Sequence, residues 1–304
     1  MQDNTITADM KKLLSIFISV LFAATSLHAE SALVIIAHGH TLESWRKPVL
    51  ALEDTVREQL AARGIKDFSY VRVAMMEYTE PSVASVMRDC QERGIDTVFA
   101  LPLFIAPSSH SEDDLPNILG LKFSKEVRDE LKEEGTEFVK GNMKIVLGPT
   151  LYSTDIIEKI MLERVRTLSV NPAEEAVVIL AHGDPERAGF WNNLLSRSAD
   201  YIKEQTSITY TDGEQVAMGM HMADELTAIL EKAAEHKKRI LVQGIYLTSN
   251  VKNMAERIGM KERQKELEKK GVSVVYSDQG ILPLATPEIS GWIIDRAEEW
   301  KAED

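Results

Sequence analysis

The chain has almost no cysteine and fewer cationic than anionic residues. Cys90 is its single cysteine, so no disulfide can form within the chain, and stability must come from a packed core, for which 44% hydrophobic residues suffice. We expect Cys90 itself to be a buried small residue in a helix, not a ligand. Lysine and arginine number 35 against 48 aspartates and glutamates, a net charge of −13. This balance argues against nucleic-acid binding and against attraction to anionic lipid, because both need basic faces.

The apolar run near the N-terminus is too short for a comfortable membrane span. Met10-Lys11-Lys12 begins a short basic region, 13–25 is almost entirely apolar, and Ala29 supplies a small residue at a plausible cleavage point. This order is typical of a secretory signal peptide, although an N-terminal core helix is the alternative. We therefore expect residues 1–29 to be removed and the mature protein to be exported to the periplasm, with no stable membrane span.

Two segments about half the chain apart share one signature, an apolar run of strand length that ends in Ala-His-Gly. They are 32–39 (ALVIIAHG) and 176–183 (AVVILAHG). Continuous apolar runs are typical of parallel strands buried on both faces, and glycine lets the chain turn tightly out of the strand. Similar pairs follow in the same order, 73–75 with 216–218 and 98–105 with 240–247.

Amphipathic stretches of helical spacing alternate with these strands. The pattern predicts an α/β fold of two similar lobes, each a parallel sheet flanked by helices, with a cleft between them. We place the lobes at 30–170 and 176–304, on either side of the polar, proline-containing join at 171–175. In such folds the ligand cleft lies at the carboxyl ends of the strands.

Three side chains of the first lobe follow predicted strands directly. His38 follows the first strand, Glu77 the second and His110 the third. Two imidazoles and a carboxylate suit divalent iron, cobalt, nickel or zinc, and the imidazoles are also bases near physiological pH. His40 is either a third ligand or a polar loop residue. A metal-dependent hydrolase that uses His38 and His40 is an alternative, although the first lobe supplies few further ligands for it.

Four segments of the first lobe, taken together, resemble a known family. They are 33–39 (LVIIAHG), 77–83 (EYTEPSV), 102–116 with its Pro-Leu-Phe start, loop histidine and acidic-apolar-proline end, and 148–151 (GPTL) with the later Arg164. In this order they are similar to segments of the class II chelatases that insert cobalt or iron into sirohydrochlorin.

The resemblance implies two α/β lobes that face each other across a cleft, and an enzyme that inserts a metal ion into an anionic tetrapyrrole without ATP. The absence of a Gly-x-x-x-x-Gly-Lys-Ser/Thr segment agrees with the expectation that no nucleotide is bound. Carried over residue by residue, the metal ligands are His38 and His110, and Glu77 is the helping carboxylate. The metal is a substrate, Co²⁺ or Fe²⁺, with Ni²⁺ as a third candidate. A homo-oligomer is compatible with the sequence.

The second lobe departs from this pattern. It keeps His182, but 246–252, the counterpart of the His110 loop, contains no histidine, and His221 stands near the position of Glu77. We expect this lobe to close the cleft, with His182 and His221 either as accessory ligand-binding groups or as structural residues. Because the chain is acidic, carboxylates of the tetrapyrrole need local cations, for which we name Arg46, Lys47 and Lys252. Candidate apolar surfaces for the ring are Trp45, Met75, Met76 and Phe104.

The main rival hypothesis is an exported carrier that holds a metal ion or a metallated tetrapyrrole without catalysing insertion. Export favours it, because tetrapyrrole synthesis is normally expected in the cytoplasm.

Overall fold

The computed structural model describes residues 31–215 and 222–303. The expected signal peptide, His221 and the segment 216–218 lie outside the described residues. Within the described part of the chain, no helix is both long enough and apolar enough to cross a membrane.

The first lobe is built on a parallel sheet of four strands. Their order across the sheet is β2 (Phe68–Met75), β1 (Ser31–Ala37), β3 (Thr97–Pro102) and β4 (Lys144–Leu147). Every residue of β1 is buried. Its side chains alternate between two hydrophobic cores, with Leu33 and Ile35 on one face and Val34 and Ile36 on the other, as the two-residue period of a strand requires.

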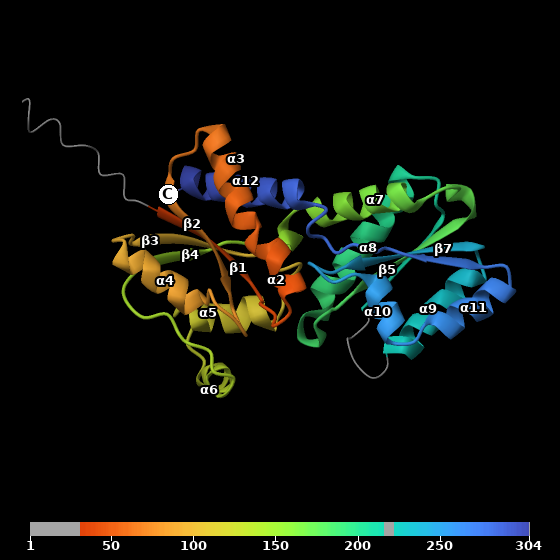
Figure 1. The fold of residues 1–304 in the computed structure, drawn as a ribbon, viewed down its shortest axis with the longest axis horizontal. Helices are drawn as coiled ribbons and strands as arrows, with labels where there is room; N and C mark the ends of the chain where they lie inside the picture. Colours follow the sequence, from red (N-terminus) through yellow and green to blue (C-terminus); the bar gives the residue numbers. More distant parts are fainter. Residues whose placement is uncertain (1–30, 216–221, 304) are drawn as a thin grey trace, which may run out of the picture.

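The second lobe repeats this topology. Its strands run in the order β6 (Tyr210–Gln215), β5 (Glu175–Ala181), β7 (Arg239–Ile245) and β8 (Ser273–Tyr276), again all parallel. The central strand, β5, is buried throughout, as β1 is. The predicted α/β fold of two similar lobes is therefore confirmed (Figure 1).

Helices cover both faces of each sheet. In chain order those of the first half are α2 (Glu43–Leu50), α3 (Leu52–Arg63), α4 (Val83–Glu92), α5 (Leu115–Ile118), α6 (Lys125–Glu133) and α7 (Ile156–Leu168). Those of the second half are α8 (Ala188–Gln205), α9 (Met222–Ala234), α10 (Val251–Arg257), α11 (Lys261–Lys269) and α12 (Thr286–Glu303). Short helical turns are η1 (His110–Asp114, a π-turn), η2 (Leu151–Ser153), η3 (Pro172–Glu174) and η4 (Pro185–Arg187). Cys90 is fully buried in α4, as expected.

Two helices cross from one lobe to the other. α7 follows the first sheet but packs against α8 and β7 of the second lobe, while α12, at the end of the chain, packs against α3 and β3 of the first (Figure 1). Trp300 of α12 stacks on Phe99 of β3, with ring centroids 5.1 Å apart. Buried Arg164 of α7 donates to the carbonyls of Gly244 and Gly280 in the second lobe. One hydrophobic core therefore runs through both lobes and fixes how they face each other.

Candidate metal centre

His38, Glu77 and His110 meet at the carboxyl ends of β1, β2 and β3. Each offers one ligand atom, and these atoms all lie within 4.8 Å of one another. His38 Nε2 is 3.7 Å from Glu77 Oε2, and His110 Nδ1 is 3.8 Å from Glu77 Oε1. The two imidazole centroids are 4.6 Å apart. The three side chains are therefore within common reach of one ion, while their role as ligands stays a prediction.

A close approach of two loops brings these residues together. The amide of Glu77 donates to the carbonyl of His38 (2.9 Å), so the loop after β2 lies against the turn after β1. Gly39 in that turn has φ +102°, and a Cβ there would lie 2.2 Å from the carbonyl oxygen of Glu77. Only glycine fits this position, which explains on steric grounds why a glycine follows His38.

Hydrogen bonds assign the tautomers of both imidazoles. Nδ1 of His38 lies 3.0 Å from the carbonyl oxygen of Gly39, which can only accept, so Nδ1 carries the hydrogen and Nε2 keeps its lone pair. Nδ1 of His110 lies 2.8 Å from Asp114 Oδ2 and donates to that carboxylate, which leaves its Nε2 free as well. A carboxylate partner of this kind orients a metal-binding histidine and increases its basicity.

The two imidazoles differ in their affinity for protons. Burial lowers the pKa of His38, and the charges of His110 and His182 lower it further, although Gly39 and Glu77 oppose this. The hydrogen bond to Asp114 raises the pKa of His110. A metal ion therefore meets less competition from a proton at His38 than at His110.

His182 occupies the corresponding turn of the second lobe. Its Nδ1 donates to the carbonyl of Gly183 (2.9 Å), the same local bond that His38 makes. Its charge contributes to the lowered pKa of His38, so the two histidines lie close enough to interact electrostatically. Among the described residues, however, His38, Glu77 and His110 form the one group of three that could hold an ion.

His40 and Arg46 shape the loop after β1. Nδ1 of His40 accepts from the amide of Leu42 (2.9 Å), and its ring stacks on Trp45. Arg46 donates to the carbonyls of His40 and Thr41, at 3.0 and 2.6 Å. His40 thus serves the loop and stands outside the three-residue group, which removes the main support for the hydrolase alternative.

A groove of about 470 Å³ lies between the lobes beside His40. Arg257, at the end of α10, lines it. Basic residues are common in the last turn of a helix, so the sequence alone does not distinguish Arg257 as a ligand-binding residue. Lys252 instead lines a separate hollow beside α11, and Lys47 is exposed. Met75 and Met76 are 0% and 3% exposed and pack in the cores, so the expectation that they face a ligand is wrong, whereas Trp45 does line the groove.

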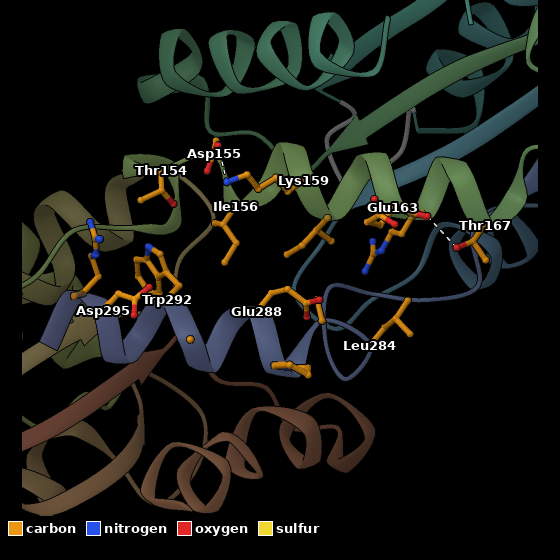
Figure 2. Close-up of a pocket in the computed structure, with 16 residues that line it drawn as sticks. Thr154, Asp155, Ile156, Lys159, Glu163, Thr167, Leu284, Glu288, Trp292 and Asp295 are labelled. Atoms are coloured by element: carbon orange, nitrogen blue, oxygen red, sulfur yellow. Dashed lines mark hydrogen bonds and ion pairs between the residues drawn. The ribbon is translucent and has the colours of Figure 1, made fainter. Parts of the chain in front are cut away.

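A further hollow follows the crossing helices. It lies between α7 and α12 and has a volume of about 600 Å³. Figure 2 shows Ile156, Lys159 and Glu163 of α7 opposite Glu288 and Trp292 of α12. No residue of the three-ligand group lines it, so it is separate from the metal centre.

The fold and the site together define a two-lobed α/β protein with a candidate metal centre at the carboxyl ends of its first sheet. Residues 32–168 match the model of the CbiX family. The first lobe is therefore similar to that family, and the resemblance to class II chelatases found in the sequence is confirmed there.

Individual relatives agree with this. The sirohydrochlorin cobaltochelatase of Methanococcus maripaludis is 37% identical over 90 residues, which cover 30% of this chain and 58% of the relative. The corresponding enzyme of Methanopyrus kandleri is 33% identical over 91 residues, covering 30% of this chain and 59% of the relative. The chain thus spans somewhat less than three fifths of the length of each of these curated relatives.

Solved structures extend the likeness to both lobes. SirB from Bacillus subtilis, determined with Fe³⁺, superposes with a TM-score of 0.62 at 14% identity, over 89% of this chain and 95% of SirB. A CbiX structure described as the terminal enzyme of siroheme biosynthesis in denitrifying bacteria gives a TM-score of 0.51 at 16% identity, over 87% of this chain and 98% of that one. At such identities the likeness is one of fold.

Proposed function

We propose that this protein inserts a divalent metal ion, Co²⁺ or Fe²⁺, into a sirohydrochlorin-type tetrapyrrole without using a nucleotide. The convergence of His38, Glu77 and His110 within 4.8 Å carries the proposal. It is supported by the relatives named sirohydrochlorin cobaltochelatase and by the likeness to structures solved with iron or cobalt.

The ligand set suits transfer of an ion more than its permanent storage. The two imidazole nitrogens leave coordination positions open on the ion, whether or not the Glu77 carboxylate also binds it, as catalytic metal sites do. The side chains of His38 and His110 are 31% and 39% exposed, so an incoming ligand can reach an ion that they hold. The ion can therefore exchange its remaining water molecules for pyrrole nitrogens.

Metal insertion also requires that two pyrrole N–H protons leave the macrocycle. Glu77 stands between both imidazoles and is 11% exposed, so it is placed to accept a proton at the moment when the nitrogen binds the metal. A general base of this kind typically contributes about 10²- to 10⁴-fold to the rate. We assign this role to Glu77 and metal delivery to the two histidines.

The groove between the lobes suits the edge of a polycarboxylate macrocycle. Trp45 supplies an apolar wall and Arg257 an exposed cation. A guanidinium pairs well with a carboxylate, which offsets the long-range repulsion expected from a net charge of −13.

The pattern of residues 10–29 supports a second proposal, that the chain is exported to the periplasm. Export is the feature that favours a carrier of metal or metallated tetrapyrrole over an enzyme. The two functions differ in stoichiometry, since a carrier binds one equivalent of ligand and an enzyme turns over many.

The deciding experiment mixes the purified protein with metal-free sirohydrochlorin and Co²⁺, Fe²⁺ or Ni²⁺, and follows the absorbance of the macrocycle. A chelatase gives many turnovers above the uncatalysed rate, and His38→Ala and His110→Ala abolish them. One-to-one binding with no rate above background would instead establish the carrier.

A further inference from the structure

Asp184 of the second lobe occupies the place that His40 holds in the first, directly after Ala-His-Gly. Both residues close the local turn. His40 Nδ1 accepts from the amide of Leu42 (2.9 Å), and Asp184 Oδ1 accepts from the amides of Glu186 (2.8 Å) and Arg187 (3.1 Å). A carboxylate differs from an imidazole in having a second acceptor oxygen on the same carbon, which is free to make bonds elsewhere.

That second oxygen reaches across to the first lobe. Asp184 Oδ2 accepts from the backbone amide of Ser109 (2.8 Å) and from its hydroxyl (3.0 Å). Ser109 directly precedes His110 in the chain. Asp184 is 8% exposed and makes four hydrogen bonds, so this contact between the lobes is largely shielded from water.

A second contact between the lobes involves η1, the helical turn that begins at His110. Arg187 Nη2 donates to Asp113 Oδ2 (2.8 Å), and Asp113 lies within η1, three residues after His110. Lys122 of the first lobe holds the other oxygen of Asp113 (2.5 Å). Asp184 and Arg187 of the second lobe therefore bind the chain on both sides of His110, at Ser109 and at Asp113.

We propose that Asp184 is a positioning residue for the metal centre: the second Ala-His-Gly turn anchors the loop that carries His110. This inference rests on the proposed function, because it gives the second lobe a part in assembling the site of the first. His38 and Glu77 are set by the first lobe's own strand ends, whereas His110 lies on a loop whose ordering uses the other lobe. A ligand held in advance loses less conformational freedom when the ion binds, and the affinity rises accordingly.

The test is Co²⁺ binding to the metal-free protein, measured by calorimetry and by the visible absorption of the bound ion. In Asp184→Asn, Oδ1 still closes its own turn, but an N–H group faces the N–H of Ser109. We expect about tenfold weaker binding and an altered visible spectrum, the scale seen when groups that support metal ligands are changed. Ser109→Ala keeps the backbone bond and should lose less.

Tyr152→Phe is the matched control. It removes another hydrogen bond between the lobes, from the Tyr152 hydroxyl to Asn193 Oδ1 (2.9 Å), without touching the His110 turn. Its Co²⁺ affinity and spectrum should equal those of the wild type. Equal weakening in Tyr152→Phe and Asp184→Asn would overturn the inference, because lobe contact in general would then explain the loss.

The remaining outcomes separate this inference from the proposed function. Wild-type affinity and spectrum in Asp184→Asn would overturn the positioning role and leave the chelatase proposal standing. If His38→Ala and His110→Ala bind Co²⁺ as tightly as the wild type does, both the positioning role of Asp184 and the chelatase proposal are overturned. If Asp184→Asn does not fold, Ser109→Ala decides: weaker binding at an unchanged melting temperature supports the role, and unchanged binding contradicts it.

Discussion

The two lobes have the same strand order and the same Ala-His-Gly turn, yet among residues 31–215 and 222–303 only the first lobe gathers a set of three ligands. The central strands β1 and β5 are both fully buried, and both histidines donate Nδ1–H to the following glycine carbonyl. The central strand and the turn after it are thus duplicated. What differs is the loop after the third strand of each lobe, because the loop at 246–252 contains no histidine. A shared fold therefore positions a site, and the local side chains decide whether it functions.

The largest difference between the lobes is expected when their histidines are replaced. His110→Ala removes one of two imidazole ligands, and we expect metal insertion to fall by more than about 100-fold, beyond the loss seen for groups that only support a ligand. His182→Ala should lower the rate only a few-fold, because His182 stands outside the three-ligand group. Initial rates with metal-free sirohydrochlorin and Co²⁺ measure both, and equal losses would mean that the functional site lies between the lobes or in the second one.

The glycines of the two turns allow the stability cost of an added Cβ to be compared between the lobes. Gly39 and Gly183 have φ of +102° and +75°. In Gly39→Ala the new Cβ also meets the Glu77 carbonyl oxygen at 2.2 Å, so we expect a loss of about 2–3 kcal/mol in the free energy of unfolding. Gly183→Ala should cost at least about 1 kcal/mol from the left-handed conformation alone. Urea titrations compare them, and a reversed order would contradict the close approach of the first lobe's loops.

His110 of the first lobe donates to the carboxylate of Asp114, whereas His182 of the second lobe donates to a backbone carbonyl. Asp114→Asn should weaken Co²⁺ binding at high pH by about 10- to 100-fold through loss of orientation. The carboxylate raises the pKa of His110, and protonated His110 cannot bind metal, so wild-type affinity falls as the pH drops through that raised pKa. In the variant this fall should move to lower pH.

Co²⁺ titrations over about pH 5 to 8, the range in which histidines titrate, record both effects. A variant whose affinity falls at the wild-type pH would show that another group controls the pH dependence.

The smallest effect is expected for the cations of the groove. Arg257→Gln, in the second lobe, should raise KM for the tetrapyrrole by roughly 2- to 5-fold with little change in kcat, since an exposed ion pair contributes at most about 1 kcal/mol. Lys47→Gln, in the first lobe, is the control and should change KM less, because Lys47 does not line the groove. A larger effect for Lys47 would place the carboxylates on the first lobe's side.

Several features follow from local sequence pattern alone. Fully apolar runs such as 32–37 predict central parallel strands, and glycine after each histidine predicts the turn. Because the ends of parallel strands lie along one edge of a sheet, His38, Glu77 and His110 could be placed together before any coordinates were known. Their 4.8 Å proximity agrees with that argument.

Contacts between segments distant in the chain could not be derived in this way. Helical periodicity identifies α7 and α12 as helices, but it contains nothing about which sheet each one covers, and they cover the opposite lobes. The same holds for Arg257 in the groove and for Asp184 against Ser109.

The sequence by itself determined the α/β class, the duplication and the three candidate ligands, because strand burial, tight turns and strand ends are encoded by neighbouring residues. Only the tertiary structure decided how the lobes face each other and that the second lobe holds the His110 loop. Those contacts join residues far apart in the chain, and the packing of one core through both lobes brings them within hydrogen-bonding distance.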